Sequence, residues 1–261
     1  MYTRAMEIPV SGTYPSVGGG SLAFHDSGGS GSPVVLLHGW MTDRRVYADL
    51  LALLSNDRRY IVPNLRGTEG AVEDYSIDAY VTDVVTLADQ LSLSSFALVG
   101  HSFGGQLAQH VAARAAERVT RLVLLNPVPT TGLPLPDEMA GHFRGAGGNA
   151  DALGGILDNV TVALPPQTRE RLLAVAVAQA PETIAGCFNT WSGGLPDAAV
   201  EIRCPTTVVA TDDPVLTQDL LRTAVAEKIP GAESAHLPNN GHYPLNESPQ
   251  QTASLLDRLL E

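Results

Sequence analysis

The sequence predicts an α/β fold built around a mostly parallel β-sheet. Short, continuous apolar runs alternate with amphipathic helical segments along the first half of the chain and again near its end. Apolar runs of this kind are typical of strands that are buried on both faces. The alternation favours right-handed crossovers between parallel strands. The composition agrees, because 44% hydrophobic and 17% charged residues in a chain of 261 suit a large globular core.

The chain predicts an eight-stranded sheet flanked by helices. Two runs, 5–10 and 21–26, flank Gly18–Gly20 and predict an antiparallel hairpin at one edge. The other strands are expected at 33–37, 60–64, from Phe96 onward, 119–125, 206–210 and 234–237. Helices are expected at 44–54, at 77–91 after an N-cap at Ser76, and at 103–116, about 216–227 and 249–261.

Residues 126–200 interrupt the alternation. This region contains several prolines and glycines and no strand of the buried type. It contains only helix-like pieces, near 150–158, 166–179 and 181–190. We therefore expect a core domain formed by residues 1–126 and 201–261, with residues 127–200 inserted as a helical cap over the sheet.

Charge and composition argue against several functions. A formal net charge of −12 disfavours binding to nucleic acid, whose phosphates are negative. The first residues contain no apolar signal-peptide stretch, and no run is long enough to span a membrane. A cytoplasmic protein with a small-molecule substrate is expected. Cys187 and Cys204 are expected to be free thiols, and no Cys/His spacing indicates a metal site, so no cofactor is expected.

The most informative stretch is Gly100-His101-Ser102-Phe103-Gly104. It follows an apolar strand and precedes a helix, which is the context of the Gly-x-Ser-x-Gly nucleophile elbow. The glycines allow a sharp bend and close packing of helix on strand. Ser102 is therefore the candidate nucleophile, although a serine at an ordinary strand-to-helix turn would look similar in isolation.

A reactive serine needs a base, and the base needs an orienting acid. His242 lies in a Gly-His-x-Pro loop after the last predicted strand, and Asp212 and Asp213 follow the strand before it. The order Ser102, Asp213, His242 is the order that nucleophile-elbow enzymes use. We favour Asp213 over Asp212 as the acid, because the residue before Pro214 is held extended.

Backbone N–H groups are expected to bind the oxyanion of a tetrahedral intermediate. One is the amide of Phe103, directly after the candidate nucleophile. The other is the amide of Trp40, because His38-Gly39 allows the loop after the 33–37 strand to bend inward.

Taken together, these motifs resemble the α/β-hydrolase fold. The resemblance is carried by His38-Gly39-Trp40, Arg66-Gly67, the Ser102 elbow, Asp213 and Gly241-His242, and it covers nearly the whole chain. It implies that the cap follows the sixth strand and shapes the substrate pocket. The residues expected at this pocket are His38, Met139, His142, Phe143, Phe188, Trp191 and Tyr243. The loop Asn64–Gly70 departs from the usual pattern of the family.

The segments Gly39–Tyr47 and Ile61–Gly67 are also similar to cofactor-free dioxygenases of the same fold, which cleave quinolones with a histidine base. In that group the acid lies at the end of the sixth strand. Here Asn126 occupies that position and is no carboxylate, and an apolar Phe103 follows the nucleophile. Both features favour hydrolysis.

The sequence therefore predicts a serine hydrolase that cleaves an ester, a lactone or a related carbonyl bond of a small to medium apolar substrate. The alternatives are a cofactor-free dioxygenase, a C–C bond hydrolase and a ligand receptor without catalysis, since one scaffold hosts many functions.

Overall fold

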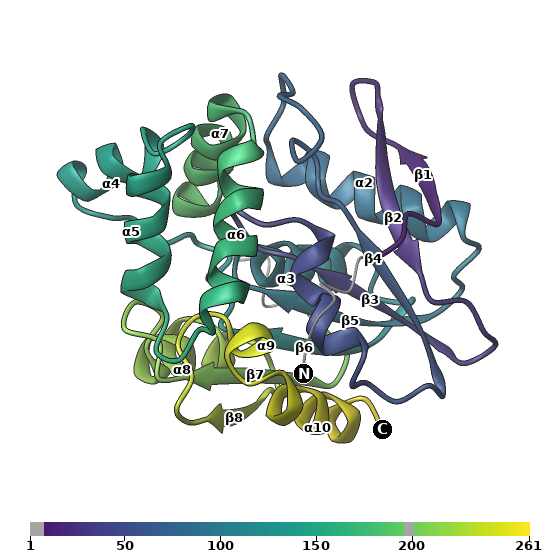
Figure 1. The fold of residues 1–261 in the computed structure, drawn as a ribbon. Coiled ribbons are helices and arrows are strands. Elements are labelled where there is room, and N and C mark those ends of the chain that lie inside the picture. The colour runs from purple at the N-terminus through teal and green to yellow at the C-terminus, as the bar shows by residue number, and fades with distance from the viewer. Residues whose placement is uncertain (1–7, 196–200) are drawn as a thin grey trace.

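The computed structural model describes residues 8–195 and 201–261. Its centre is one eight-stranded sheet with the order β1-β2-β4-β3-β5-β6-β7-β8 (Figure 1). The pairs β1–β2 and β2–β4 are antiparallel, and every other pair is parallel. The predicted mostly parallel eight-stranded sheet is confirmed. Its strands are β1 (Gly12–Pro15), β2 (Ser21–Asp26), β3 (Ser32–Leu37), β4 (Arg58–Pro63), β5 (Phe96–His101), β6 (Val119–Leu125), β7 (Thr206–Thr211) and β8 (Glu233–Leu237).

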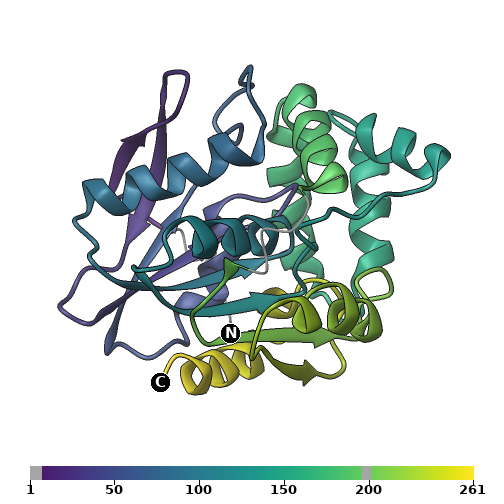
Figure 2. The same ribbon diagram turned by 180° about the vertical axis from the view of Figure 1, so that it is seen from behind.

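Helices cover both faces of the sheet (Figures 1 and 2). One face packs against α2 (Ile77–Gln90), α3 (Phe103–Arg114) and α8 (Gln218–Ala224), which is followed by the short η3 (Ala226–Lys228). The other face packs against η1 (Arg44–Tyr47), α1 (Ala48–Leu51), α9 (Pro244–Glu247) and α10 (Pro249–Leu259).

Strand β3 shows why these apolar runs form a central sheet. Val35 and Leu37 belong to the core on the α2–α3 side, whereas Val34 and Leu36 belong to the core on the α10 side. All four side chains are at most 1% exposed. Alternate residues of a strand point to opposite faces, so a continuous apolar run is buried by helices on both sides.

The N-terminal strand differs from the prediction. The predicted strand at 5–10 lies partly outside the described residues, and residues 8–10 are not strand. The antiparallel edge hairpin is present, but its first strand is β1, at Gly12–Pro15. Ile8 is buried in the core without pairing, and Pro9 has no N–H to donate to a ladder. Of the described residues 8–10, only Ile8 is buried, and Val10 is 53% exposed, so no strand forms there.

In the described part of the chain, four α-helices lie between β6 and β7, and we call them the cap helices: α4 (Asp137–Arg144), α5 (Ala150–Val160), α6 (Pro166–Ala178) and α7 (Pro181–Gly193). They gather at one side of the molecule, beyond the carboxyl ends of the parallel strands (Figures 1 and 2). Helix α4 was not expected, and none of its residues is buried. Among the described helices, none alone is long and apolar enough to cross a membrane, although α6 and α7, bent by 100°, pass that test as a pair.

Gly104 allows α3 to pack closely against the end of β3. A Cβ at this position would lie 2.3 Å from the carbonyl oxygen of Leu37. The backbone of β3 or α3 would have to move to relieve this overlap. Gly155, in helix α5, has open space around its own Cβ position.

We therefore expect Gly104→Ala to lower the free energy of unfolding by more than about 2 kcal/mol, because overpacking displaces backbone. Gly155→Ala is the matched control and should raise it by about 0.5–1 kcal/mol, because alanine has the higher helix propensity. Urea unfolding of both variants measures the two changes. Equal effects of the two substitutions would contradict the proposed close approach at Gly104.

Candidate active site

Ser102 lies at a strained turn between β5 and α3. Its backbone has φ 56° and ψ −121°, a region that residues other than glycine rarely adopt. The backbone around it is heavily hydrogen-bonded. The Ser102 N–H donates to the Leu125 carbonyl at 3.0 Å, and the Ser102 carbonyl accepts from the N–H groups of Gly105, Gln106 and Val128. These bonds hold a conformation that the serine does not favour by itself.

Ser102, His242 and Asp213 form a hydrogen-bonded chain. His242 Nε2 lies 2.8 Å from Ser102 Oγ, and His242 Nδ1 lies 2.6 Å from Asp213 Oδ2. A carboxylate only accepts, so Nδ1 carries the proton and donates it to Asp213. Nε2 is then the acceptor for the Ser102 hydroxyl. The three residues follow β5, β8 and β7, whose carboxyl ends meet at one edge of the sheet.

The two adjacent aspartates occupy different places. Asp213 is buried, and besides His242 it accepts from the N–H groups of Val215 and Leu216. Burial pushes the pKa of Asp213 upward, but the charge and hydrogen bond of His242 and the two N–H donors outweigh burial and lower it. Exposed Asp212 instead accepts from the Asn239 N–H and pairs with His236.

The lowered pKa of Asp213 has a consequence for stability. A carboxyl whose folded pKa is depressed stabilises the fold above its unfolded pKa, and this stabilisation is lost as the pH falls through the lowered folded value. Because its pKa is lowered in the folded protein, Asp213 is ionised at neutral pH, as an acceptor for His242 must be.

Two buried side chains hold the backbone of His242. The Nε2–H of His101 donates to the His242 carbonyl at 2.7 Å, and Asn126 Nδ2 lies 3.3 Å from the same oxygen. Burial, together with the nearby His242, lowers the pKa of His101 to about 3, so His101 stays neutral. Asn126 also exchanges hydrogen bonds with Thr211, two residues before Asp213. Asn126 thus links the loops of the base and the acid, a role that its position in the sequence did not indicate.

Glu247 is another residue that sequence reasoning missed. Its buried carboxylate joins the His242 loop to the end of α5 by accepting from four backbone N–H groups, those of residues 162, 163, 241 and 243. The N–H of His242 itself donates to the Val160 carbonyl at 2.7 Å. His242 is therefore positioned by contacts with the cap helices as well as with the core.

The loop after β3 approaches Ser102 closely. A Cβ on Gly39 would lie 3.0 Å from Ser102 Cβ, and Met41 adopts φ 64°. The N–H of Trp40 has no acceptor in the described part of the chain. Phe103 is the first residue of α3, where a helix leaves its N–H groups without intrahelical acceptors. Both predicted oxyanion donors thus lie in the segments that flank Ser102.

His38 fastens this loop to the one after β4. Its Nε2 accepts from the Leu65 N–H at 3.0 Å, so its Nδ1 carries the proton and donates to the Gly39 carbonyl. Burial lowers its pKa to about 4, which keeps it neutral. The unusual loop Asn64–Gly70 is held further by Arg66, whose buried guanidinium pairs with Asp83 at 2.9 Å.

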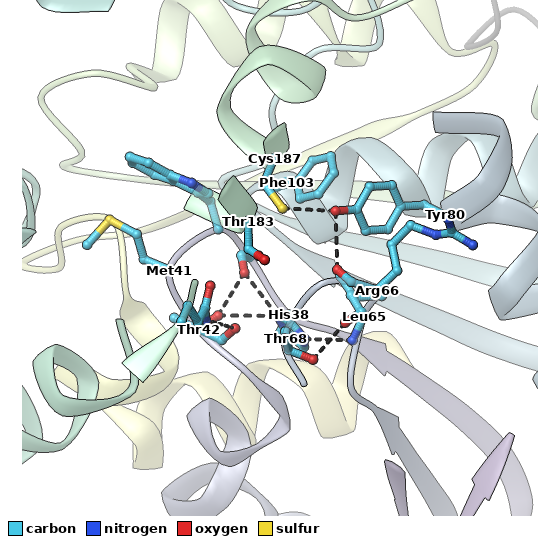
Figure 3. Close-up of a pocket in the computed structure, with 13 residues that line it drawn as sticks. His38, Met41, Thr42, Leu65, Arg66, Thr68, Tyr80, Phe103, Thr183 and Cys187 are labelled. Atoms are coloured by element: carbon cyan, nitrogen blue, oxygen red, sulfur yellow. Dashed lines mark hydrogen bonds between the residues drawn. The ribbon is translucent and has the colours of Figure 1, made fainter. Parts of the chain in front are cut away.

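Helix α7 braces the same region from the cap side. Trp40 Nε1 donates to the Ile184 carbonyl at 2.9 Å, and Thr183 Oγ1 donates to the Gly67 carbonyl at 2.9 Å. Figure 3 shows Tyr80, whose ring contacts Phe103, with its hydroxyl between Cys187 Sγ and the Arg66 carbonyl. Each segment that carries a predicted oxyanion donor is thus linked to α7. Cys187 and Cys204 are free thiols.

A largely apolar cavity opens in front of Ser102. Four of the seven residues expected at the pocket line it: Met139, Phe143, Trp191 and Tyr243. The other three do not, because His38 lies behind the loop that follows β3, the side chain of His142 is exposed, and Phe188 packs behind Trp191. The remaining lining residues are Trp40, Met41, Ser102, Val128, Leu133, Leu135, Ile156, Leu157, Val160, Val215, Leu216 and His242.

Trp40 and Trp191 pack in one aromatic cluster with ring centroids 5.8 Å apart, but only the Trp40 indole has a hydrogen-bond partner. We expect Trp40→Phe to lower the free energy of unfolding by about 0.5–1.5 kcal/mol more than Trp191→Phe does, because it removes the hydrogen bond to the Ile184 carbonyl. The two substitutions remove the same volume, so urea unfolding isolates the hydrogen bond. If Trp191→Phe lowers the free energy of unfolding as much as Trp40→Phe does, the bracing role of the Trp40 indole is contradicted.

Curated relatives match part of the chain. A soluble epoxide hydrolase of Corynebacterium sp. (strain C12) is 31% identical over 132 residues, 47% of this chain and 46% of that protein. A 2-hydroxymuconate semialdehyde hydrolase of Pseudomonas sp. (strain CF600) is 37% identical over 112 residues, 39% of this chain and 38% of that protein. The chain thus matches about half or less of the length of these relatives.

Solved structures match over nearly the whole chain. An esterase (EaEST) from Exiguobacterium antarcticum has a TM-score of 0.86 at 19% identity, covering 95% of this chain and 99% of that one. The enol-lactonase from Burkholderia xenovorans LB400 has a TM-score of 0.83 at 24% identity, covering 96% and 98%. At such identities the likeness concerns the fold. The model of the alpha/beta hydrolase family matches residues 34–255, and the chain therefore belongs to the alpha/beta hydrolase family.

Proposed function

We propose that this protein is a serine hydrolase that cleaves an ester or lactone through an acyl-enzyme. The observation that carries the proposal is the continuous hydrogen-bonded chain from Ser102 Oγ through His242 to Asp213, with distances of 2.8 and 2.6 Å. A serine hydroxyl is a weak nucleophile at neutral pH, and a base at this distance activates it. Membership of the alpha/beta hydrolase family supports the assignment to hydrolysis.

In the proposed reaction, His242 Nε2 takes the Ser102 proton as Oγ attacks the substrate carbonyl carbon. The oxygen becomes negative and is bound by the amides of Trp40 and Phe103. The tetrahedral intermediate collapses when His242 gives its proton to the leaving oxygen, which releases the alcohol. Water, deprotonated by His242, then attacks the acyl carbon of the acyl-enzyme. The bond to Ser102 Oγ breaks, the carboxylic acid leaves, and His242 returns the proton to Ser102 Oγ. Asp213 orients the imidazole and stabilises its charged form.

The cavity favours a neutral substrate. Its lining contains no Lys, Arg, Asp or Glu within residues 8–195 and 201–261, and isolated charges are costly to bury. The semialdehyde hydrolase and the related 2-hydroxy-6-oxo-2,4-heptadienoate hydrolase act on acids by their names. An acid substrate would find no cationic side chain in this lining. We therefore favour an ester or lactone over hydrolysis of a C–C bond in an acid, and we propose that the cap helices shape the acyl site.

A fluorophosphonate probe tests the nucleophile. We expect the intact protein to be labelled once, at Ser102, because the probe phosphorylates an activated serine. Ser102→Ala should abolish the labelling. Mass spectrometry of the intact protein and of its peptides measures both results. Absence of labelling in the wild type, or equal labelling of Ser102→Ala, would refute the mechanism.

The neighbouring aspartates provide a matched pair for the acid. Asp213→Asn should lower kcat/KM for an aryl ester about 10³-fold or more, because an amide does not hold His242 in the required tautomer. Asp212→Asn should lower it less than about tenfold, because Asp212 braces an exposed loop. Steady-state kinetics at neutral pH measures both. Similar losses in the two variants would show that the acid is wrongly assigned.

A further inference from the structure

The cavity in front of Ser102 contains few polar atoms. Apart from Ser102 and His242, its side chains contribute only three N–H or O–H groups, those of Trp40, Trp191 and Tyr243. The Trp40 indole already donates to the Ile184 carbonyl. Among the residues that the structure describes, no carboxylate, amide or further hydroxyl lines the cavity. The unpaired hydrogen-bonding groups of this described lining, apart from Ser102 and His242, are therefore the Tyr243 hydroxyl and the Trp191 indole N–H.

Tyr243 is the donor beside the reacting groups. It is 5% exposed, and its ring packs against His242 and His101 with centroids 5.1 Å from each. Its hydroxyl has no hydrogen-bond partner in residues 8–195 and 201–261. Most other buried tyrosines use theirs, as Tyr14 does on the Asn64 carbonyl. Burial and the charges of Asp213 and Glu247 raise the pKa of Tyr243, so the hydroxyl keeps its proton.

Trp191 supplies a second donor from the cap. It is 6% exposed, and its buried Nε1 has no partner. It comes from α7, whereas Tyr243 comes from the core loop that follows β8. The two donors therefore belong to different parts of the chain that meet at one cavity.

The buried Trp191 Nε1 without an acceptor costs about 1–3 kcal/mol, and an acceptor on a ligand recovers this loss. The Tyr243 hydroxyl is unpaired at the cavity wall and can donate to the same kind of ligand oxygen. A site built to hydrogen-bond a substrate oxygen also rejects an analogue that lacks it. Because the described lining residues carry no charge and their unpaired groups include two donors, Tyr243 O–H and Trp191 Nε1–H, the matching ligand is neutral and carries an acceptor oxygen.

We propose that the substrate is a neutral ester or lactone whose acyl part carries a second acceptor oxygen, such as an ether or keto oxygen, which accepts a hydrogen bond from Tyr243. Trp191 is the auxiliary donor from the cap side. This inference rests on the proposed hydrolase function and narrows its substrate class from apolar acyl groups to oxygen-bearing ones.

The test uses p-nitrophenyl hexanoate and its three isosteres in which an ether oxygen replaces C3, C4 or C5. Chain length stays constant, and an ether oxygen accepts but does not donate. For each isostere, kcat/KM is divided by that for hexanoate. Comparing this ratio between wild type and Tyr243→Phe cancels the intrinsic reactivity of each ester. We expect the ratio for one isostere to fall about tenfold in Tyr243→Phe, the effect of one hydrogen bond.

Tyr60→Phe is the matched control. The Tyr60 hydroxyl is buried and, like that of Tyr243, has no hydrogen-bond partner, but Tyr60 does not line the cavity. The ratio should be unchanged in this variant. Equal ratios in wild type and Tyr243→Phe for all three isosteres overturn the proposal. If the isostere-to-hexanoate ratio falls in Trp191→Phe and not in Tyr243→Phe, the assignment to Tyr243 is overturned.

A binding measurement separates this inference from the proposed function. Calorimetry with Ser102→Ala gives the Kd of each intact ester, and the double variant with Tyr243→Phe should lose the preference for the isostere. If no ester is cleaved and the fluorophosphonate does not react, the hydrolase proposal fails. The preference in binding then decides by itself whether Tyr243 recognises an acceptor oxygen.

Discussion

The backbone conformation of Ser102 is the constraint on which the rest of the structure depends. A serine at φ 56° is strained by about 1–3 kcal/mol, and such a turn persists only when its surroundings hold it. Here the end of β6 accepts its N–H, and its carbonyl accepts from three N–H groups. The close approach of α3 to β3 at Gly104 is part of the same arrangement. The hydroxyl is thereby presented at the sheet edge where His242 and Asp213 arrive.

Polar side chains buried around this turn hold backbone in place. His38, His101 and Asn126 are each at most 2% exposed, and each hydrogen-bonds to the backbone of a loop that carries a site residue. Burial lowers the pKa of both histidines, so they act as neutral, directional groups. Buried polar groups are stable only when paired, which makes such contacts specific for one loop geometry. This explains how loops without regular structure can position reacting atoms.

The cap helices take part in this positioning. Helix α7 binds the Trp40 indole and the loop after β4, and the end of α5 binds the His242 loop through Glu247. The same helices line the cavity, α7 with Trp191 and α5 with Ile156 and Leu157. The helices that line the cavity therefore also support the segments around Ser102 and His242.

By itself, the sequence determined the mostly parallel sheet and pointed to Ser102, Asp213 and His242, which hydrogen-bond to one another in the structure. These follow from local rules, because buried runs of β-branched and leucine residues form strands and the elbow needs glycines at fixed offsets. The tertiary structure alone decided the strand at Gly12–Pro15, helix α4, the roles of Asn126 and Glu247, and the absence of His38 and His142 from the cavity. The residues that these groups contact are distant in sequence. Whether two loops hydrogen-bond, or whether a cap side chain points into the cavity, depends on how the segments meet in space. Such contacts leave no local pattern in the sequence.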